Sequence, residues 1–214
     1  MIVYPLVLNS NVQGGLMELK KIVTGCFFIF ALIGVAPGAR AQDVGNYPAV
    51  TGYSTESTTT SSMPGGQTMV SHAKEYYTKE KYRFESSVDG VGITSSGFSI
   101  VRLDKNVLWT FMPEHNMYTE SPASSTMAHP WPQDISKAKI IGTETIDGQL
   151  TDKYDDSNEK CNSSTTFLSH SSGLPVKVEI HCGGDVVVEY KNTQIGDQPD
   201  SLFEMPAGYK KMSF

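Results

Sequence analysis

The sequence has little cysteine and no excess of basic residues. Three cysteines among 214 residues are too few for a small disulfide-rich scaffold. The 17 Lys and Arg residues are outnumbered by 23 Asp and Glu residues, and the resulting net charge of −6 disfavours non-specific nucleic-acid binding. The chain is 39% hydrophobic, which supports a packed core. These figures predict a single acidic globular domain with no nucleic-acid partner.

Long hydrophobic runs are absent apart from one short run near the start. Residues 22–35 are mostly apolar, but this run is shorter than the roughly 20 residues that a membrane-spanning helix needs. Lys20 and Lys21 precede the run and Ala39-Arg40-Ala41 follows it, an arrangement typical of a secretory signal peptide. We therefore expect residues 1–41 to be a signal peptide cleaved after Ala41, with no transmembrane span in the mature chain.

An uncleaved membrane anchor is one alternative to the cleaved signal peptide. Two details of this segment leave further alternatives open. Met17 begins a more natural leader, so an over-extended start covering residues 1–16 is one interpretation. The tetrad ending at Cys26 has the form of a lipoprotein processing site, but this cysteine opens the apolar run whereas lipid attachment needs it at the end. Cleavage after Ala41 leaves 14 basic and 22 acidic residues, a net charge of −8, in a periplasmic or otherwise exported protein.

The mature chain reads as a series of strands. Helical periodicity is scarce and turn signals recur about every 8 to 12 residues, which favours an antiparallel all-β fold with at most minor α structure. Residues 42–66 are interpreted as a polar lead-in or edge strand, and residues 67–214 as the β domain. Within that domain 67–78 and 81–88 form a predicted pair, with Phe84 on one face and Arg83 and Glu85 on the other. Short connections predict that sequence neighbours are neighbours in the sheet.

Turn positions predict the register of the hairpins. In a regular antiparallel hairpin, the residue numbers of two opposed residues always add up to the same value, which the position of the turn sets. The turn at residues 113–116 places Phe111 opposite Tyr118, and it also pairs Trp109 with Glu120 and Met112 with Met117. The Asp147-Gly148 turn places Ile141 opposite Tyr154.

A further hairpin turns at residues 171–173 and brings two cysteines together. Its register places Cys161 directly opposite Cys182. The same register gives two further pairs, Phe167–Val176 and Thr165–Val178. An exported protein folds in an oxidising compartment, so we predict a cross-strand disulfide between Cys161 and Cys182, worth roughly 3 kcal/mol by the chain-entropy model. Metal ligation and redox chemistry are the alternatives, but no Cys-x-x-Cys spacing supports them.

The longest connection runs from residue 122 to residue 137. It combines Pro122, Pro130 and Pro132 with Met127 and Trp131. A connection of this length without regular structure is usually functional or disordered. We expect an apolar lid or strap, with a short helix at residues 133–138 as one form of it.

An ordered series of short segments resembles a known family. The segments include Tyr82-Arg83-Phe84-Glu85, residues 102–109, 112–114, 118–120, 141–148, 153–154, 173–175 and the tail 203–209. Over about residues 67–210 this order resembles the outer-membrane lipoprotein carrier (Lol-type) superfamily, in an exported bacterial branch other than the carrier itself. The resemblance implies a curved antiparallel meander sheet that forms an incomplete barrel, with a loop or short helix over its concave face. It also implies that the hollow carries or senses a lipid or another apolar group.

The inner face of such a half-barrel must either be covered by another part of the chain or be used to bind a ligand. Aromatic and Met side chains suit an adaptable apolar cavity. The candidates are Phe84, Phe98, Ile100, Trp109, Phe111, Met112, Met117, Tyr118 and Trp131. Trp109 and Phe111 share a face by period two and Tyr118 opposes Phe111, so this aromatic cluster is the first choice for the cavity. Alternation alone does not distinguish a lined hollow from a filled core beneath a strap, and the filled core stays the alternative for each residue.

Catalytic and metal-binding motifs are scarce. The sequence has no Gly-x-Ser-x-Gly elbow, no His-Glu-x-x-His motif and no Gly-rich phosphate loop. Its histidines are scattered over predicted turns and strands, at His72, His115, His129, His170 and His181. We therefore predict a non-enzymatic periplasmic protein without a cofactor or metal that binds a lipid or other apolar ligand in a half-barrel. The alternative is a non-catalytic envelope interaction protein with a filled core, whose edge strand recruits a partner protein.

Overall fold

The computed structural model describes residues 47–62, 66–90, 93–124, 138–157 and 163–212. The predicted signal peptide over residues 1–41 lies outside these ranges. So do Trp131 and most of the predicted strap and short helix, which fall in residues 125–137. These predictions therefore stay as they were.

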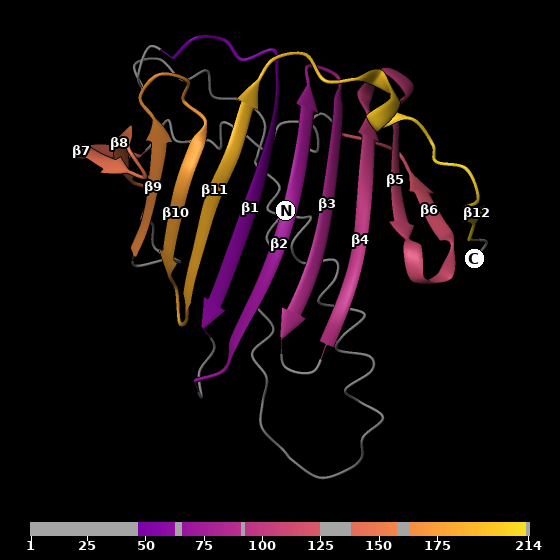
Figure 1. Cartoon of the computed structure of the whole chain (residues 1–214), viewed down its shortest axis with the longest axis horizontal. Helices are drawn as coiled ribbons and strands as arrows, with labels where there is room; N and C mark the ends of the chain where they lie inside the picture. Colours follow the sequence, from indigo (N-terminus) through magenta and orange to yellow (C-terminus); the bar gives the residue numbers. More distant parts are fainter. Residues whose placement is uncertain (1–46, 63–65, 91–92, 125–137, 158–162, 213–214) are drawn as a thin grey trace. The chain divides into compact units, whose positions relative to one another are not determined.

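The described chain forms one open, curved and mainly antiparallel sheet, which confirms the predicted all-β fold (Figure 1). The strands lie in the order β12-β6-β5-β4-β3-β2-β1-β11-β10-β9-β8-β7. Their bounds are β1 Gly52–Ser62, β2 Thr68–Thr78, β3 Lys81–Gly90, β4 Ile93–Arg102, β5 Val107–Met112, β6 Met117–Ser121, β7 Lys139–Ile146, β8 Gln149–Asp155, β9 Ser163–Ser169, β10 Pro175–His181, β11 Asp185–Ile195 and β12 Lys210–Lys211. Short 3-10 helices lie at η1 Leu103–Lys105, η2 Pro113–His115 and η4 Asp200–Phe203. Among the described residues, no helix has the length and apolar character needed to cross a bilayer.

The rule that sequence neighbours are sheet neighbours holds for β1–β2 and β10–β11, and among the described strands it fails at β6–β7 and β11–β12. Strand β1 corrects another prediction. The strand itself was predicted, but β1 lies in the middle of the sheet, between β2 and β11, and not at an edge. The polar composition of β1 is compatible with this position because threonine is β-branched and suits a central strand. Its hydroxyls find partners there, as when Thr55 Oγ1 lies 2.8 Å from Thr193 Oγ1.

The register of the β5–β6 hairpin is confirmed. Phe111 lies opposite Tyr118 and Trp109 lies opposite Glu120, as the predicted index sum requires. Asn106 and Asn116 adopt φ values of 53° and 51° at the ends of η1 and η2. Asparagine tolerates this left-handed conformation better than most residues, which allows both turns to be tight.

Two other hairpins contain β-bulges, and their predicted registers are wrong beyond the bulge. In β7–β8 the predicted register holds from Gly142 to Ile146, but Tyr154 lies opposite Ile140 and not opposite Ile141. In β9–β10 the pair Leu168–Pro175 fits the prediction. A shift after Pro175 then pairs Phe167 with Lys177 in place of Val176, Thr166 with Val178, and Thr165 with Glu179 in place of Val178. A bulge inserts one residue into one strand, which a constant index sum does not anticipate.

The two faces of the sheet differ in character. The register places Trp109, Ile100, Arg83 and Tyr76 in one row across β5, β4, β3 and β2. We call their face of the sheet the strap face, after the C-terminal segment of residues 199–212 that packs on it. The row beside it joins residues of the opposite face, Val101, Tyr82, Tyr77 and Tyr53, and we call that face the tyrosine face. Away from the β-bulges, the residues of the paired strands are thereby assigned to one face or the other, because side chains alternate along a strand.

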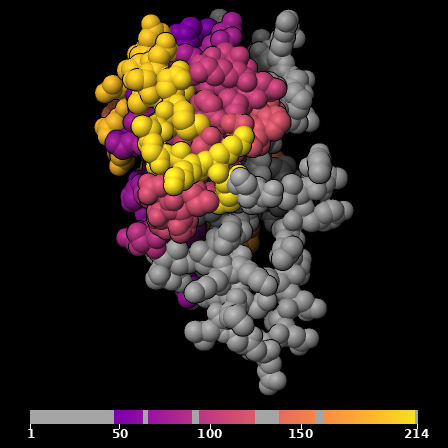
Figure 2. Space-filling model, turned by 90° about the vertical axis from the view of Figure 1, so that its right-hand side faces the viewer, coloured from indigo at the N-terminus to yellow at the C-terminus, as the bar shows by residue number. Residues whose placement is uncertain are grey.

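The chain ends in a segment that packs back onto the strap face. This C-terminal strap, residues 199–212, contains η4 and the short strand β12, which pairs in parallel with β6. Figure 2 shows the yellow C-terminal residues spread over the pink strands β4–β6. The strap therefore covers one end of the strap face.

Candidate functional site

The structure places the predicted cavity residues on opposite faces of the sheet. Phe84 and Met117 lie on the tyrosine face, together with Met112. The other described candidates lie on the strap face, namely Phe98, Ile100, Trp109, Phe111 and Tyr118. Antiparallel pairing of β3 with β4 sets Phe84 opposite Ser99 and Phe98 opposite Glu85, so Phe84 and Phe98 cannot share a face.

The aromatic cluster chosen first from the sequence is closely packed beneath the C-terminal strap. Ile100, Trp109 and Phe111 form a buried cluster with Phe203 of η4, and their exposed fractions are 0, 9, 1 and 0%. Phe98 stacks on Phe111 with ring centroids 4.3 Å apart. This arrangement resembles the alternative interpretation of these residues, a filled core, but the covering segment is residues 199–212 and not the predicted strap at residues 122–137.

Arg102 fastens the strap to the sheet. Its side chain is almost fully buried, and its guanidinium donates hydrogen bonds to both carboxylate oxygens of Asp104, at 2.8 and 2.6 Å. It also donates to the Phe203 carbonyl at 3.2 Å and to the Glu204 carboxylate at 2.6 Å. Hydrogen bonding to Arg102 lowers the pKa of both Asp104 and Glu204. A buried cation with charged partners on both sides holds η4 at one position over the sheet.

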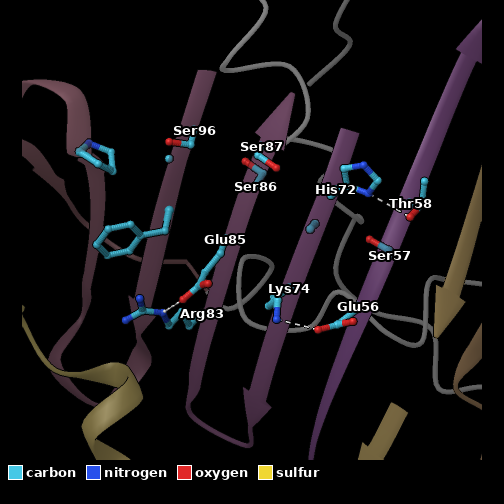
Figure 3. A pocket seen from close by; sticks show the side chains of 14 residues that line it. Glu56, Ser57, Thr58, His72, Lys74, Arg83, Glu85, Ser86, Ser87 and Ser96 are labelled. Atoms are coloured by element: carbon cyan, nitrogen blue, oxygen red, sulfur yellow. Dashed lines mark hydrogen bonds and ion pairs between the residues drawn. The ribbon is translucent and has the colours of Figure 1, made fainter. Parts of the chain in front are cut away.

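The rest of the strap face carries a shallow polar groove across β1–β4 (Figure 3). Its volume is about 430 Å³, and its charged side chains are paired with one another. Lys74 Nζ lies 2.7 Å from the Glu56 carboxylate, and Arg83 Nε lies 2.7 Å from the Glu85 carboxylate. The Arg83 guanidinium also lies 4.6 Å from the centroid of the Phe98 ring. These mutual pairs leave little uncompensated charge for a ligand.

The tyrosine face contains a buried carboxyl group that the sequence analysis missed. Glu75 of β2 is 5% exposed, and its Oε2 accepts a hydrogen bond from the Tyr82 hydroxyl at 3.1 Å. Burial raises the pKa of Glu75 to about 7, although the hydrogen bond from Tyr82 acts in the opposite direction. Burial is also the largest cause that raises the pKa of Tyr82 and of Tyr53, followed by the neighbouring Glu75 carboxyl.

Aromatic rings lie on one side of the Glu75 carboxyl. Tyr53 stacks on Tyr77 with ring centroids 5.2 Å apart, and Leu174 from the β9–β10 connection packs against both rings. The Tyr53 hydroxyl is buried and has no hydrogen-bond partner among the described residues. A buried hydroxyl without a partner is unfavourable, so this atom calls for an explanation.

A row of small side chains runs across the tyrosine face beside Glu75. Ser57, Ala73, Ser86 and Gly97 are paired in register from β1 to β4. The adjacent row on the same face contains Glu75 itself and consists of Thr55, Glu75, Phe84 and Ser99. Along each strand, the small residue is two positions away from the member of that row. Small side chains leave the backbone low along this line. This row of small side chains therefore lies directly beside Glu75, the only buried carboxyl described on the tyrosine face.

Half-buried apolar side chains line the remainder of the tyrosine face. They lie on β2, β3, β5, β6 and β11, at Met69, Phe84, Val88, Leu108, Met112, Met117, Val186 and Val188. At the β8–β10 end the same face becomes a packed cluster around Tyr154, Leu168 and Val178. The apolar character therefore continues across most of the sheet.

The start of the described chain is tied to this packed end. The Tyr47 hydroxyl donates to Asp152 at 2.6 Å and lies 2.9 Å from the Tyr154 hydroxyl. Burial, and then the hydrogen bond with Asp152, raise the pKa of Tyr47. The ring of Tyr47 lies directly on Gly173, where a Cβ would come within 2.5 Å of it, so a larger residue at position 173 has no room.

The histidines and cysteines show no clustering among the described residues. His72 lies 3.1 Å from Thr58 Oγ1, His170 lies 2.8 Å from Asp152 and His181 lies 2.7 Å from Asp185. No group of three or more His, Cys, Asp or Glu side chains in the described ranges is arranged to hold a metal ion. Cys182 follows β10 directly, whereas Cys161 and His129 lie outside the described residues. The disulfide between Cys161 and Cys182 stays a prediction.

Comparisons with known proteins show the fold. No family model and no curated protein matches the sequence. An uncharacterized conserved protein from Thermus thermophilus aligns with a TM-score of 0.52 and 8% identity, over 74% of this chain and 89% of that chain. A LolA superfamily protein from Nitrosomonas europaea aligns with a TM-score of 0.37 and 10% identity, over 74% and 92%. The Pseudomonas aeruginosa MucA/MucB complex aligns with a TM-score of 0.43 and 13% identity, over 76% and 59%. The alignment with the Thermus thermophilus protein supports the fold of the sheet, and the aligned structures include a LolA superfamily protein, the kind of protein that the sequence resembles.

Proposed function

We propose that this chain is a periplasmic binding protein without catalytic activity, which holds an apolar or lipid-like ligand on the tyrosine face. The observation that carries the proposal is the series of half-buried apolar side chains on that face. Such a surface gains free energy when a ligand removes it from water, by about 25 cal/mol per Å² of apolar area. On the strap face of the described chain, the apolar end is filled by the C-terminal strap, and the groove is lined mainly by charged and polar residue types.

The proposal locates the ligand on the opposite face from the aromatic cluster that the sequence favoured. Phe84 and Met117 remain contact residues for the ligand, whereas Phe98, Ile100, Trp109, Phe111 and Tyr118 serve the attachment of the strap. The signal peptide predicted from the sequence supports export to the periplasm, where lipids in transit are apolar molecules that such a surface would bind.

Two adjacent valines on β11 provide a matched test. Val188 lies on the tyrosine face and Val187 on the strap face, and both are half-buried. In a titration with the apolar fluorophore N-phenyl-1-naphthylamine, Val188→Asn is expected to raise the Kd about tenfold because it removes apolar contact with the probe. Val187→Asn is expected to leave the Kd close to that of the unmodified protein.

Circular dichroism and thermal unfolding of both variants serve as folding controls. Equal effects of the two substitutions, or a failure of the unmodified protein to bind the probe, contradict the proposal.

A further inference from the structure

We propose that Glu75, with the hydroxyls of Tyr82 and Tyr53, receives the positively charged head group of an amphiphile whose apolar chain lies on the tyrosine face. This inference rests on the proposed function and specifies its ligand class. The expected ligand is an alkylammonium type of molecule, with N–H donors at the end of an apolar chain.

The first support is that Glu75 has no cationic partner among the described residues. The described side chains on the tyrosine face of β1–β4 and β11 include no lysine and no arginine. The nearby basic residues of β2 and β3, Lys74 and Arg83, lie on the strap face and are paired with Glu56 and Glu85. A buried carboxylate without a cation is unfavourable, so the group must take up either a proton or a cation from outside.

The second support is the Tyr53 hydroxyl. It is buried, has no hydrogen-bond partner in the described chain, and is close enough to Glu75 for the carboxyl to raise its pKa. A phenol oxygen accepts hydrogen bonds, so an ammonium group bonded to Glu75 is able to donate to Tyr53 as well. The stacked Tyr53 and Tyr77 rings add aromatic surface, which attracts cations.

The third support is the shape of the face next to the carboxyl. Leu174 covers the Tyr53 and Tyr77 side of Glu75, whereas the row Ser57, Ala73, Ser86 and Gly97 lies on its other side. An alkyl chain lying along this row brings its polar end beside Glu75. The half-buried Phe84 and Val88 of β3 lie on either side of Ser86 in this row and provide apolar contact.

The titratable groups that face Glu75 do not compete for its charge. In the part of the chain that the structure describes, they are the phenols Tyr53 on β1, Tyr77 on β2, Tyr82 on β3 and Tyr190 on β11. Burial raises the pKa of Tyr53, Tyr77 and Tyr82, so these three stay neutral at physiological pH. Because burial also raises the pKa of Glu75 to about 7, a cation is expected to bind more tightly above pH 7 than below it.

Three ligands of equal chain length test the inference by isothermal titration calorimetry at pH 8 with the full mature chain. Decylamine, which is cationic at this pH, is expected to bind at least tenfold more tightly than decanol, and decanoate is expected to bind most weakly because its carboxylate faces Glu75. Glu75→Gln is expected to reduce the ratio of decylamine to decanol affinity about tenfold. Glu85→Gln, on the strap face of the next strand, is the matched control and is expected to keep the ratio.

The outcomes separate the two proposals. Tight binding of decanol with no preference for decylamine, or a preference that survives Glu75→Gln, overturns the head-group assignment and leaves the apolar site in place. A lack of binding of all three ligands overturns the proposed function and this inference with it.

Discussion

Replacing Phe203 with alanine is expected to lower the free energy of unfolding by about 3–5 kcal/mol. The Phe203 side chain is fully buried between the strap and the sheet, where it contacts the cluster of Ile100, Trp109 and Phe111. Truncation leaves a cavity that the surrounding β-sheet cannot close, because its strands are held in register by their hydrogen bonds. Urea denaturation followed by circular dichroism measures the change.

An exposed apolar residue provides the control for this experiment. Leu150 of β8 is 46% exposed, and Leu150→Ala is expected to change stability by no more than about 0.5 kcal/mol. A Phe203→Ala protein that is as stable as the Leu150→Ala protein shows that the strap is not docked on the sheet. The aromatic cluster beneath it is then open, and the choice between the two faces has to be reversed.

Replacing Glu75 with glutamine is expected to stabilise the protein at alkaline pH by about 3 kcal/mol. Burial raises the folded-state pKa of Glu75 from 4.5 to about 7, so the folded state binds the proton more tightly than the unfolded state. The stabilising contribution of the protonated carboxyl is therefore complete below pH 4.5 and is lost as the pH rises through 7. Each pKa step of one unit corresponds to about 1.4 kcal/mol, which gives the expected size.

Urea denaturation of both proteins at pH 4 and at pH 8.5 measures this effect. The two stabilities are expected to be similar at pH 4, and the Glu75→Gln protein is expected to be the more stable one at pH 8.5. Glu85→Gln, which removes a carboxylate paired with Arg83, is expected to show no such gain. A constant difference between the Glu75→Gln and unmodified proteins across this range contradicts a buried, cation-free carboxyl.

The two effects concern opposite faces of the same sheet. The strap face contributes stability through packing and through the charged contacts of Arg102. The tyrosine face is also packed at its β8–β10 end, but it contains the buried Glu75 carboxyl, whose ionisation is expected to lower stability at alkaline pH. A group that destabilises the free protein is expected where a ligand compensates for it. This division supports assigning the ligand to the tyrosine face.

Local features of the fold were predictable from the sequence. The β5–β6 hairpin follows from its Pro-containing turn, and its register was predicted correctly because turn and strands are adjacent in sequence. The pairing of β1 with β11 joins segments more than a hundred residues apart, and no local pattern indicates it. The bulges at Ile141 and Val176 were missed for a different reason, since they depend on how each strand fits its neighbours.

The candidate site was only partly predictable. Aromatic and Met residues were identified as a group, but sorting them between the faces needs the β3–β4 register, which sets Phe84 and Phe98 on opposite sides. The alternation of β2 does place Glu75 and Tyr77 together, and a carboxyl at an inward position is the signal that was available. The packing of the Phe203 segment on the cluster is a tertiary contact between distant residues, and no local sequence pattern indicates it.

Methyl NMR of the mature protein during a titration with decanol tests the central claim most directly, because each methyl group reports on one face. We expect shifts for methyl groups on the tyrosine face, such as those of Met69, Val88 and Leu108, while Ile100 on the strap face and Leu202 in the strap keep their positions. Shifts confined to Ile100 and Leu202, or no shifts at all, contradict an apolar ligand on the tyrosine face.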